Sequence, residues 1–276
     1  MKRSTYAGIM APFTIILICY LLTSLFDFTL ANNIISPLNA FASAAILIFV
    51  YFSLDRNKKL TLTFLIYALA CFTWGIADVI WLILSIMGED PSTSPVTWIF
   101  YVIPNCLIIF SILIFAFTQT NKWNLFQMFT DIIYIGLMSL LFLWIVLLHK
   151  DISILHAMLN LDFTSILSII TDVVIIIGFL SWFFSIRSGK NPVYIRIMSL
   201  ALLLFASIDL LYYYVVFQGL YVPNSLIDFV YALSLYLLAV GALLMIYNQN
   251  STTKLAVITN VGTREKWFYL LLYPVL

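Results

Sequence analysis

Apolar runs of about twenty residues recur along almost the whole chain, and short polar stretches separate them. A run of that length can cross a hydrocarbon core ~30 Å thick as a single helix. The composition agrees, because 64% of the residues are hydrophobic and only 9% are charged. A soluble fold is therefore excluded, and hydropathy predicts an all-α polytopic membrane protein with eight spans. The expected spans cover residues 7–26, 34–54, 60–87, 97–118, 125–148, 165–186, 195–217 and 225–247.

The basic residues fall on one side of these spans. If the N-terminus is cytoplasmic, all of the 13 Lys and Arg residues except Lys150 lie in inner segments. Short cytoplasmic loops carry such an excess because the positive-inside bias orients the chain during insertion. The sequence therefore predicts a multi-pass membrane protein whose N-terminus is inside.

Several classes of chemistry receive no support from the composition. The net charge is +1, and the cations are spread thinly, whereas binding nucleic acid requires a concentrated basic surface. Cys19, Cys71 and Cys106 fall in apolar spans, where we expect small buried hydrophobes and not disulfides or metal ligands. The two histidines, His149 and His156, share one outer loop. We predict no metal site, no cofactor and no nucleic-acid partner; the expected partner is the lipid bilayer.

Two spans resemble each other around an aspartate. Residues 70–81 and 202–213 contain Asp78 and Asp209, and each Asp has an aromatic residue four positions before it and another three after it. Each span follows a short basic inner loop and leads, through an outer loop with proline, into a helix with an aromatic cluster. The sequence therefore predicts a duplicated four-helix unit, as a parallel repeat about an axis along the membrane normal.

The chain is expected to form one transmembrane domain. The two units cover residues about 1–122 and 123–250. Residues 251–276 are expected to form a loop and the start of a ninth helix, because the apolar run 267–276 is too short to span the bilayer.

Acidic residues inside the spans are the first candidates for function. Asp78, Asp172, Asp209 and Asp228 are all expected in the outer half of the membrane. A charged group in hydrocarbon costs at least ~2.5 to 3.5 kcal/mol, so such residues usually face a bundle interior or a wet cavity and mark a functional site. No basic residue shares this zone. The acids must therefore be protonated, bonded to Tyr or Trp, solvated, or neutralised by a bound cation.

Aromatic residues are predicted to gather in the same zone, and they complete a candidate ligand pocket that opens to the outside. They are Trp74, Trp81, Trp98, Tyr101, Tyr212, Tyr213 and Tyr231, and Tyr214 is expected in the same zone. Aromatic faces attract positive charge and carboxylates supply the counter-ion, so the pocket suits an organic cation. The structural alternative is that Asp78 and Asp209 are neutral acids that bond neighbouring helices, with the rings as an ordinary interfacial belt.

Short stretches of the chain resemble a known family. These are Trp-Gly-Ile-Ala-Asp at 74–78, Ala-Ser-Ile-Asp-Leu at 206–210, Asp-Phe-Val-Tyr at 228–231, Leu-Ala-Val-Gly-Ala at 238–242 and the Leu-rich, Pro-containing run 267–274. Together they resemble the N-terminal multi-helix sensor region of bacterial membrane-bound diguanylate cyclases and phosphodiesterases of the GGDEF and EAL type, over essentially the whole chain. The resemblance implies a bacterial inner-membrane input module for cyclic di-GMP signalling, followed by further helices and a catalytic domain. The chain lacks the glycine-rich cyclase motif, so no enzyme activity is assigned to it.

Three functions remain in competition. The first is a sensory input module that binds an external or membrane-derived ligand, a small molecule or a lipid, and acts on a cytoplasmic output domain. The second is a small transporter in which Asp78 and Asp209 carry a proton or cation. The third, an intramembrane enzyme acting on lipid, ranks last because no nucleophile–base pair or metal set is recognisable. The sequence leaves open whether the protein is a homodimer.

The charge distribution makes the topology testable. Cysteine substitution followed by labelling with an impermeant thiol reagent should modify positions 92 and 224, at Ser92 and Asn224, in intact cells. Cysteines placed at Asn57 and Ser188 should stay unlabelled until the membrane is permeabilised, because those loops hold the basic residues. The opposite labelling pattern would invert the topology.

Overall fold

The computed structural model of the chain describes residues 3–26, 28–54, 59–91, 94–119, 130, 168–176, 193–218, 220–223 and 225–249. Across these residues the regular secondary structure is helical and contains no strand. A short helical segment covers residues 168–176. The long helices are α1 (Arg3–Leu25), α2 (Thr29–Ser53), α3 (Lys59–Met87), α4 (Pro95–Gln119), α8 (Val193–Phe217) and α9 (Leu226–Gln249).

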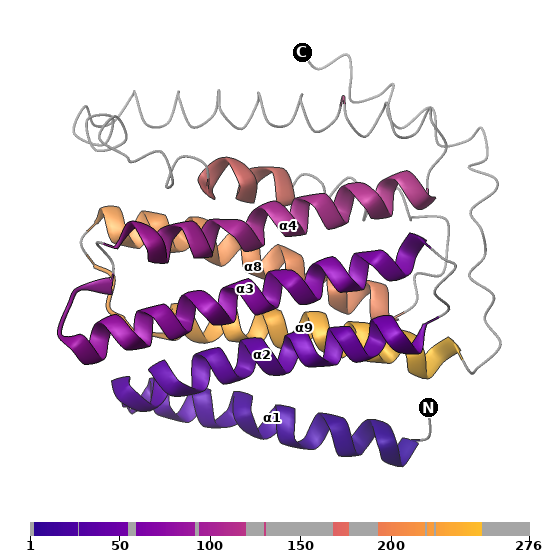
Figure 1. Ribbon diagram of the computed structural model, residues 1–276, viewed down its shortest axis with the longest axis horizontal. Coiled ribbons are helices and arrows are strands. Elements are labelled where there is room, and N and C mark those ends of the chain that lie inside the picture. Colours follow the sequence, from indigo (N-terminus) through magenta and orange to yellow (C-terminus); the bar gives the residue numbers. More distant parts are fainter. Residues whose placement is uncertain are drawn as a thin grey trace, which may run out of the picture.

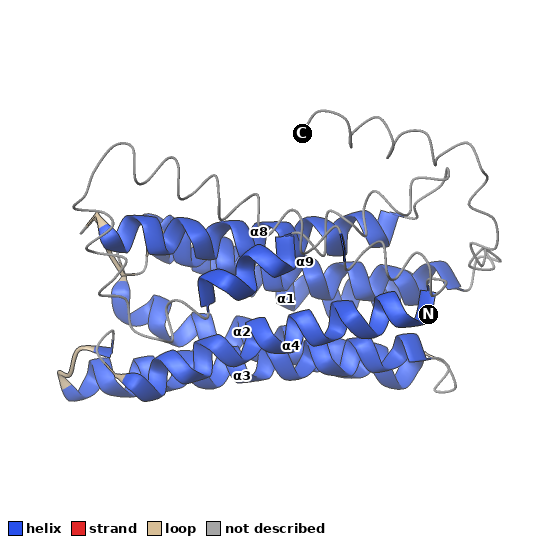
Figure 2. Cartoon of the chain, turned by 90° about the horizontal axis from the view of Figure 1, so that it is seen from above, coloured by secondary structure: helices blue, strands red, loops and turns tan. Residues whose placement is uncertain are grey.

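The long helices lie side by side along one common axis (Figures 1 and 2). The connections α1–α2, α3–α4 and α8–α9 meet at one end of the bundle, opposite the N-terminus, at the left of Figure 1. We call this the loop end. Helix α2 packs against α1, α3 and α9, while α3 also packs against α4, and α8 packs against α9.

The described helices make this a membrane-embedded helical protein. All six long helices are long and apolar enough to cross a membrane. They correspond to six of the eight expected spans. Of the other two, the span at 125–148 lies outside the described residues apart from Thr130, and only residues 168–176 of the span at 165–186 are described. The expected ninth helix also lies outside the described residues.

Helix α2 begins earlier than hydropathy predicts, at Thr29 and not at residue 34. The additional turn contains Asn32 and Asn33, which lower the local hydropathy and therefore look like loop. The Asn32 side chain is fully buried; it accepts a hydrogen bond from Thr23 Oγ1 and donates one to Ser24 Oγ at 3.2 Å. Bonds to α1 thus satisfy a polar side chain that the sequence alone places outside the helix.

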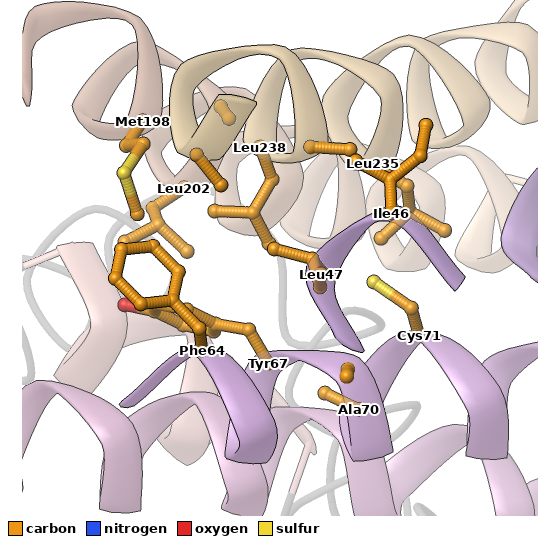
Figure 3. Packing of buried hydrophobic residues seen from close by; sticks show 14 of the residues in the cluster. Ile46, Leu47, Phe64, Tyr67, Ala70, Cys71, Met198, Leu202, Leu235 and Leu238 are labelled. Atoms are coloured by element: carbon orange, nitrogen blue, oxygen red, sulfur yellow. The ribbon is translucent and has the colours of Figure 1, made fainter. Parts of the chain in front are cut away.

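The bundle has an apolar core, and its outer faces are apolar as well. Leu47 of α2, Cys71 of α3, Leu202 of α8 and Leu238 of α9 meet in the core shown in Figure 3. Large apolar side chains are exposed on the outer faces, among them Ile15, Leu22, Leu62, Leu69, Phe72 and Phe110. Such broad apolar exposure marks a surface that contacts lipid.

Glycine allows α8 and α9 to approach closely. A Cβ atom at Gly241 of α9 would lie 2.5 Å from Met198 Cγ, and 3.1 Å from both the Met198 backbone nitrogen and the Tyr194 carbonyl oxygen of α8. The backbone contacts cannot be relieved by rotating a side chain. Small residues at helix interfaces serve this purpose in membranes, where close packing drives association.

We predict that Gly241→Ala destabilises the bundle by about 1–3 kcal/mol, the usual cost of overpacking a tight site. Thermal unfolding of the protein in detergent measures the effect. The control is Gly8→Ala in α1, where an added Cβ would meet nothing within 4 Å, so the variant should be neutral or gain up to about 1 kcal/mol from helix propensity. Equal stability of the two variants would contradict the close α8–α9 contact.

Candidate functional site

A cavity of about 90 Å³ lies at the loop end of the bundle, between residues of all six long helices and the 168–176 segment. Tyr221 and Pro223 of the α8–α9 connection also line it. The space suffices for several waters or a small organic group, since one water needs roughly 10–15 Å³ measured in this way. All of the predicted site residues except Asp172 line this cavity: Trp74, Asp78, Trp81, Trp98, Tyr101, Asp209, Tyr212, Tyr213, Asp228 and Tyr231.

Asp78 lies on the cavity wall and is bonded by two hydroxyl groups. Trp74, Asp78 and Trp81 share one face of α3, because residues three and four apart lie together on a helix. Ser36 Oγ of α2 donates to Asp78 Oδ2 at 2.6 Å, and Tyr101 OH of α4 donates to Asp78 Oδ1 at 2.8 Å. The Asp78 carboxyl group therefore links α2, α3 and α4. Its hydrogen bonds come from neutral donors, which offset the cost of burying it.

Asp209 of α8 has a similar set of partners. Tyr231 OH of α9 donates to Asp209 Oδ1 at 2.5 Å, and Ser168 Oγ donates to Asp209 Oδ2 at 3.4 Å. The Asn105 amide of α4 adds a third donor to Asp209 Oδ2, at 3.0 Å. Asp209 thus holds α8 to α9, to α4 and to the 168–176 segment.

Asp172 lies behind Asp209 and does not line the cavity. Its side chain is fully buried, and Asn105 Nδ2 donates to its Oδ1 at 3.0 Å. The same amide nitrogen lies 3.3 Å from Ser168 Oγ, so three acceptors surround one amide group. Asp172 Oδ2 and Asn105 Oδ1 have no hydrogen-bond partner among the described residues. This cluster is the most polar part of the described interior.

Asp228 opens α9 at the mouth of the cavity. Its Oδ2 accepts a hydrogen bond from the Ser225 backbone N–H at 3.2 Å. The first backbone N–H groups of a helix have no partner within the helix, and this bond satisfies one of them. Its Oδ1 accepts from Tyr221 OH at 3.1 Å. Burial, together with the nearby Asp228 charge, raises the pKa of Tyr221, so this phenol stays a hydrogen-bond donor.

Trp74 forms the aromatic centre of the site. Its ring lies 4.9 Å from the Tyr101 ring, 5.0 Å from Tyr231 and 5.2 Å from Phe205, between centroids. The contacts with Tyr101 and Phe205 are edge-to-face and the contact with Tyr231 is tilted; aromatic pairs in such arrangements add roughly 0.5–1.5 kcal/mol per pair beyond the buried area. The contacts place α3 and α4 against α8 and α9, so rings from both halves of the chain form one wall.

Sequence reasoning missed several residues of this site, mostly hydroxyl and amide side chains. They are Tyr20, Asn33, Ser36, Thr97, Ser168 and Tyr221 on the cavity wall, and Asn105 behind it. Serine and asparagine give little signal in an apolar helix because each is cheap to bury once bonded. The signal that was available is the Pro104-Asn105 pair within α4, which we expect to kink the helix.

Among the described residues, no group of three or more His, Cys, Asp or Glu side chains is placed to hold a metal ion.

No family model matches the chain, and no curated protein or solved structure is detectably similar to it.

We predict that Asn105→Leu destabilises the protein by about 2–5 kcal/mol, because it removes the shared donor from two buried carboxyl groups. Unfolding in detergent measures the loss. Cys106→Ala is the control, since the neighbouring Cys106 side chain is exposed. Adding Asp172→Leu to Asn105→Leu should recover part of the stability, since replacing both polar partners by apolar groups is cheaper than stranding one. A neutral Asn105→Leu variant would contradict the role of this amide.

Proposed function

We propose that this chain is the membrane-embedded sensory input module of a bacterial signalling protein, and that it binds a small organic cation at the loop end. The observation that carries the proposal is the lining of the cavity. Asp78, Asp209 and Asp228 supply three carboxyl groups, and the described lining residues include no Lys, Arg or His. Aromatic faces combined with carboxylates stabilise a desolvated positive charge by about 2 kcal/mol or more per good ring contact.

The alternatives to a cationic ligand fit this cavity less well. An anion would meet three carboxyl groups and no cationic side chain among the described lining residues. A neutral apolar ligand would bring no counter-charge to carboxyl groups that are hydrogen-bonded by neutral donors alone. An ammonium group restores charge balance at Asp78 and Asp209 and places its carbon substituents against Trp74 and Tyr231.

Matched clusters support the duplicated, eight-span architecture. Ser36, Asp78 and Tyr101 form one serine–aspartate–tyrosine cluster, with sequence separations of 42 and 23 residues. In the second cluster, the separation from the serine to Asp209 is 41 residues, and from Asp209 to the tyrosine it is 22. The three positions recur at nearly the same spacing on corresponding predicted spans. This is the pattern that a duplicated four-helix unit would produce.

In the proposed topology the loop end faces outside and the basic loops face the cytoplasm. The cavity lies where the two proposed units meet, since Trp74 of the first touches Phe205 and Tyr231 of the second. A ligand held between them stabilises the arrangement of the units that it fits better. The resulting shift would reach a cytoplasmic output domain of the GGDEF or EAL type, as the family resemblance implies.

A transporter coupled to protons or cations is the second candidate. The matched clusters favour it, because parallel repeats with a site at their interface are found in several transporter folds. Concentrative uptake separates the two functions. Proteoliposomes containing the protein should bind radiolabelled choline without accumulating it if the protein is a sensor, whereas accumulation would establish the transporter. In cells, added choline should change cyclic di-GMP only if the sensor proposal holds.

We predict that Asp78→Asn and Asp209→Asn leave folding largely intact while weakening choline binding at least about tenfold each, equivalent to ~1.4 kcal/mol. An amide keeps the hydrogen-bonding capacity and removes the charge. Quenching of tryptophan fluorescence reports binding, since Trp74, Trp81 and Trp98 line the cavity. Choline is compared with its neutral isostere, 3,3-dimethylbutan-1-ol.

The matched control for these variants is Glu89→Gln. Glu89 is an exposed acid at the same end of the bundle and does not line the cavity, so its substitution should not change the affinity. If choline and the isostere bound equally well, or if both aspartate variants bound like the wild type, the cation-binding proposal would fail.

A further inference from the structure

Two buried carboxyl groups share one amide donor beneath the cavity. They belong to Asp172 of the 168–176 segment and Asp209 of α8. Both are buried, Asp172 fully and Asp209 to all but 7%. The Asn105 amide nitrogen bridges them, at 3.0 Å from an oxygen of each. We call these two side chains the acid pair.

The acid pair requires a positive charge or a proton. Two carboxyl groups that share one neutral donor in a dry interior cannot both be ionised without a counter-charge, because each negative charge disfavours the other. No described Lys, Arg or His side chain bonds to either group. Asn105 offers two N–H groups to three acceptors, and Asp172 Oδ2 and Asn105 Oδ1 remain unpartnered among the described residues.

The described groups around the acid pair are phenols, an amide and a hydroxyl, and none of them is a cation. Helix α8 places the Tyr213 phenol near both carboxyl groups, and α9 places the Tyr231 phenol there. Helix α4 contributes Asn105, and the 168–176 segment contributes Ser168. The Tyr231 hydroxyl donates to Asp209, and none of these neighbours is a cation, so we assign the shared proton to the carboxyl groups.

Asp209 connects this pair to the cavity. Its Oδ1 accepts the Tyr231 hydroxyl on the cavity side, while its Oδ2 faces Asn105 and Ser168. Asp209 is a lining residue and Asp172 is not. A positive charge in the cavity therefore acts directly on one member of the pair and only through it on the other.

We propose that the acid pair exchanges its proton for the cation: when an organic cation binds in the cavity, the proton shared by Asp172 and Asp209 is released. The inference rests on the proposed function, since it names the regulation of the same site. A nearby positive charge favours the ionised form of Asp209, and the proton leaves to water through the mouth of the cavity. One positive charge enters and one departs, so the buried charge is unchanged.

Reciprocity gives the sign of the pH effect. Because binding releases a proton, raising the pH favours binding, and lowering the pH expels the ligand. For one linked proton, the apparent affinity rises about tenfold per pH unit over the range in which the free protein holds that proton. A sensor built in this way responds to the ratio of the organic cation to protons on the side to which the cavity opens.

Calorimetry of the whole chain in lipid nanodiscs tests the exchange, with choline as the probe. The binding enthalpy, measured in buffers of different ionisation enthalpy, should vary with the buffer and give about one proton released per choline bound. An enthalpy that does not depend on the buffer overturns the exchange while leaving the proposed function standing. If neither choline nor a primary ammonium compound binds, the proposed function fails, and the exchange fails with it.

Two variants assign the proton to the acid pair. Asp172→Asn should still bind choline but lose the proton release and the pH dependence. Asp78→Asn should bind choline more weakly and keep the proton release. The reverse pattern, or an unchanged release in Asp172→Asn, overturns the assignment.

An infrared difference spectrum of the wild-type protein provides a test that needs no variant, should Asp172→Asn fail to fold. Adding choline should remove the band of a protonated carboxyl group and add carboxylate bands. A spectrum with no carboxyl change contradicts the exchange. The neutral isostere of choline should leave the carboxyl region unchanged, because it brings no charge into the cavity.

Discussion

Burying carboxyl groups among helices that face lipid is the constraint on which the rest of this bundle depends. An isolated carboxylate in hydrocarbon is costly, and with no cation bonded to it among the described residues, each acid must find neutral donors. Asp78 finds Ser36 and Tyr101, and Asp209 finds Tyr231 and Asn105. Because these donors come from different helices, satisfying the acids also sets which helices are neighbours and how they are rotated about their axes.

The same bonds explain why the cavity lies at the loop end. The apolar core shown in Figure 3 is filled by aliphatic side chains together with Phe64, Tyr67 and Met198. Toward the loop end the interior becomes polar and aromatic, and the rings of Trp74 and Tyr231 meet at a tilt, with their centroids 5.0 Å apart. Rigid rings and hydrogen-bonded carboxyl groups cannot pack as closely as flexible aliphatic side chains, so they leave an irregular cavity between the helices. The site is thus a consequence of how the acids are satisfied.

A site shared by the two halves of the chain gives the proposed sensor and transporter a common physical basis. Asn105 of α4 reaches into the cluster around Asp209, and the Asn39 amide of α2 donates to the Ala232 carbonyl of α9 at 3.0 Å. These hydrogen bonds cross the interface between the two halves. A ligand in the cavity therefore lies next to the contacts that hold the halves together and can change them. Coupling at the end of the bundle opposite the loop end decides whether such a movement carries a signal or a solute.

The sequence by itself determined the helical membrane class, six of the described spans to within a few residues, and nearly all of the charged and aromatic residues around the cavity. It could do so because the cost of moving charge and polar backbone into lipid is large and local, so the pattern of residues along the chain records it.

Tertiary structure alone decided the rest. Asn32 became part of a helix because Thr23 and Ser24 of the preceding helix bond to it, and Asn105 became the bridge between Asp172 and Asp209 because three helices meet there. Hydroxyl and amide side chains carry no such signal, since whether one is satisfied depends on partners many residues away that only the packed bundle brings within hydrogen-bonding distance.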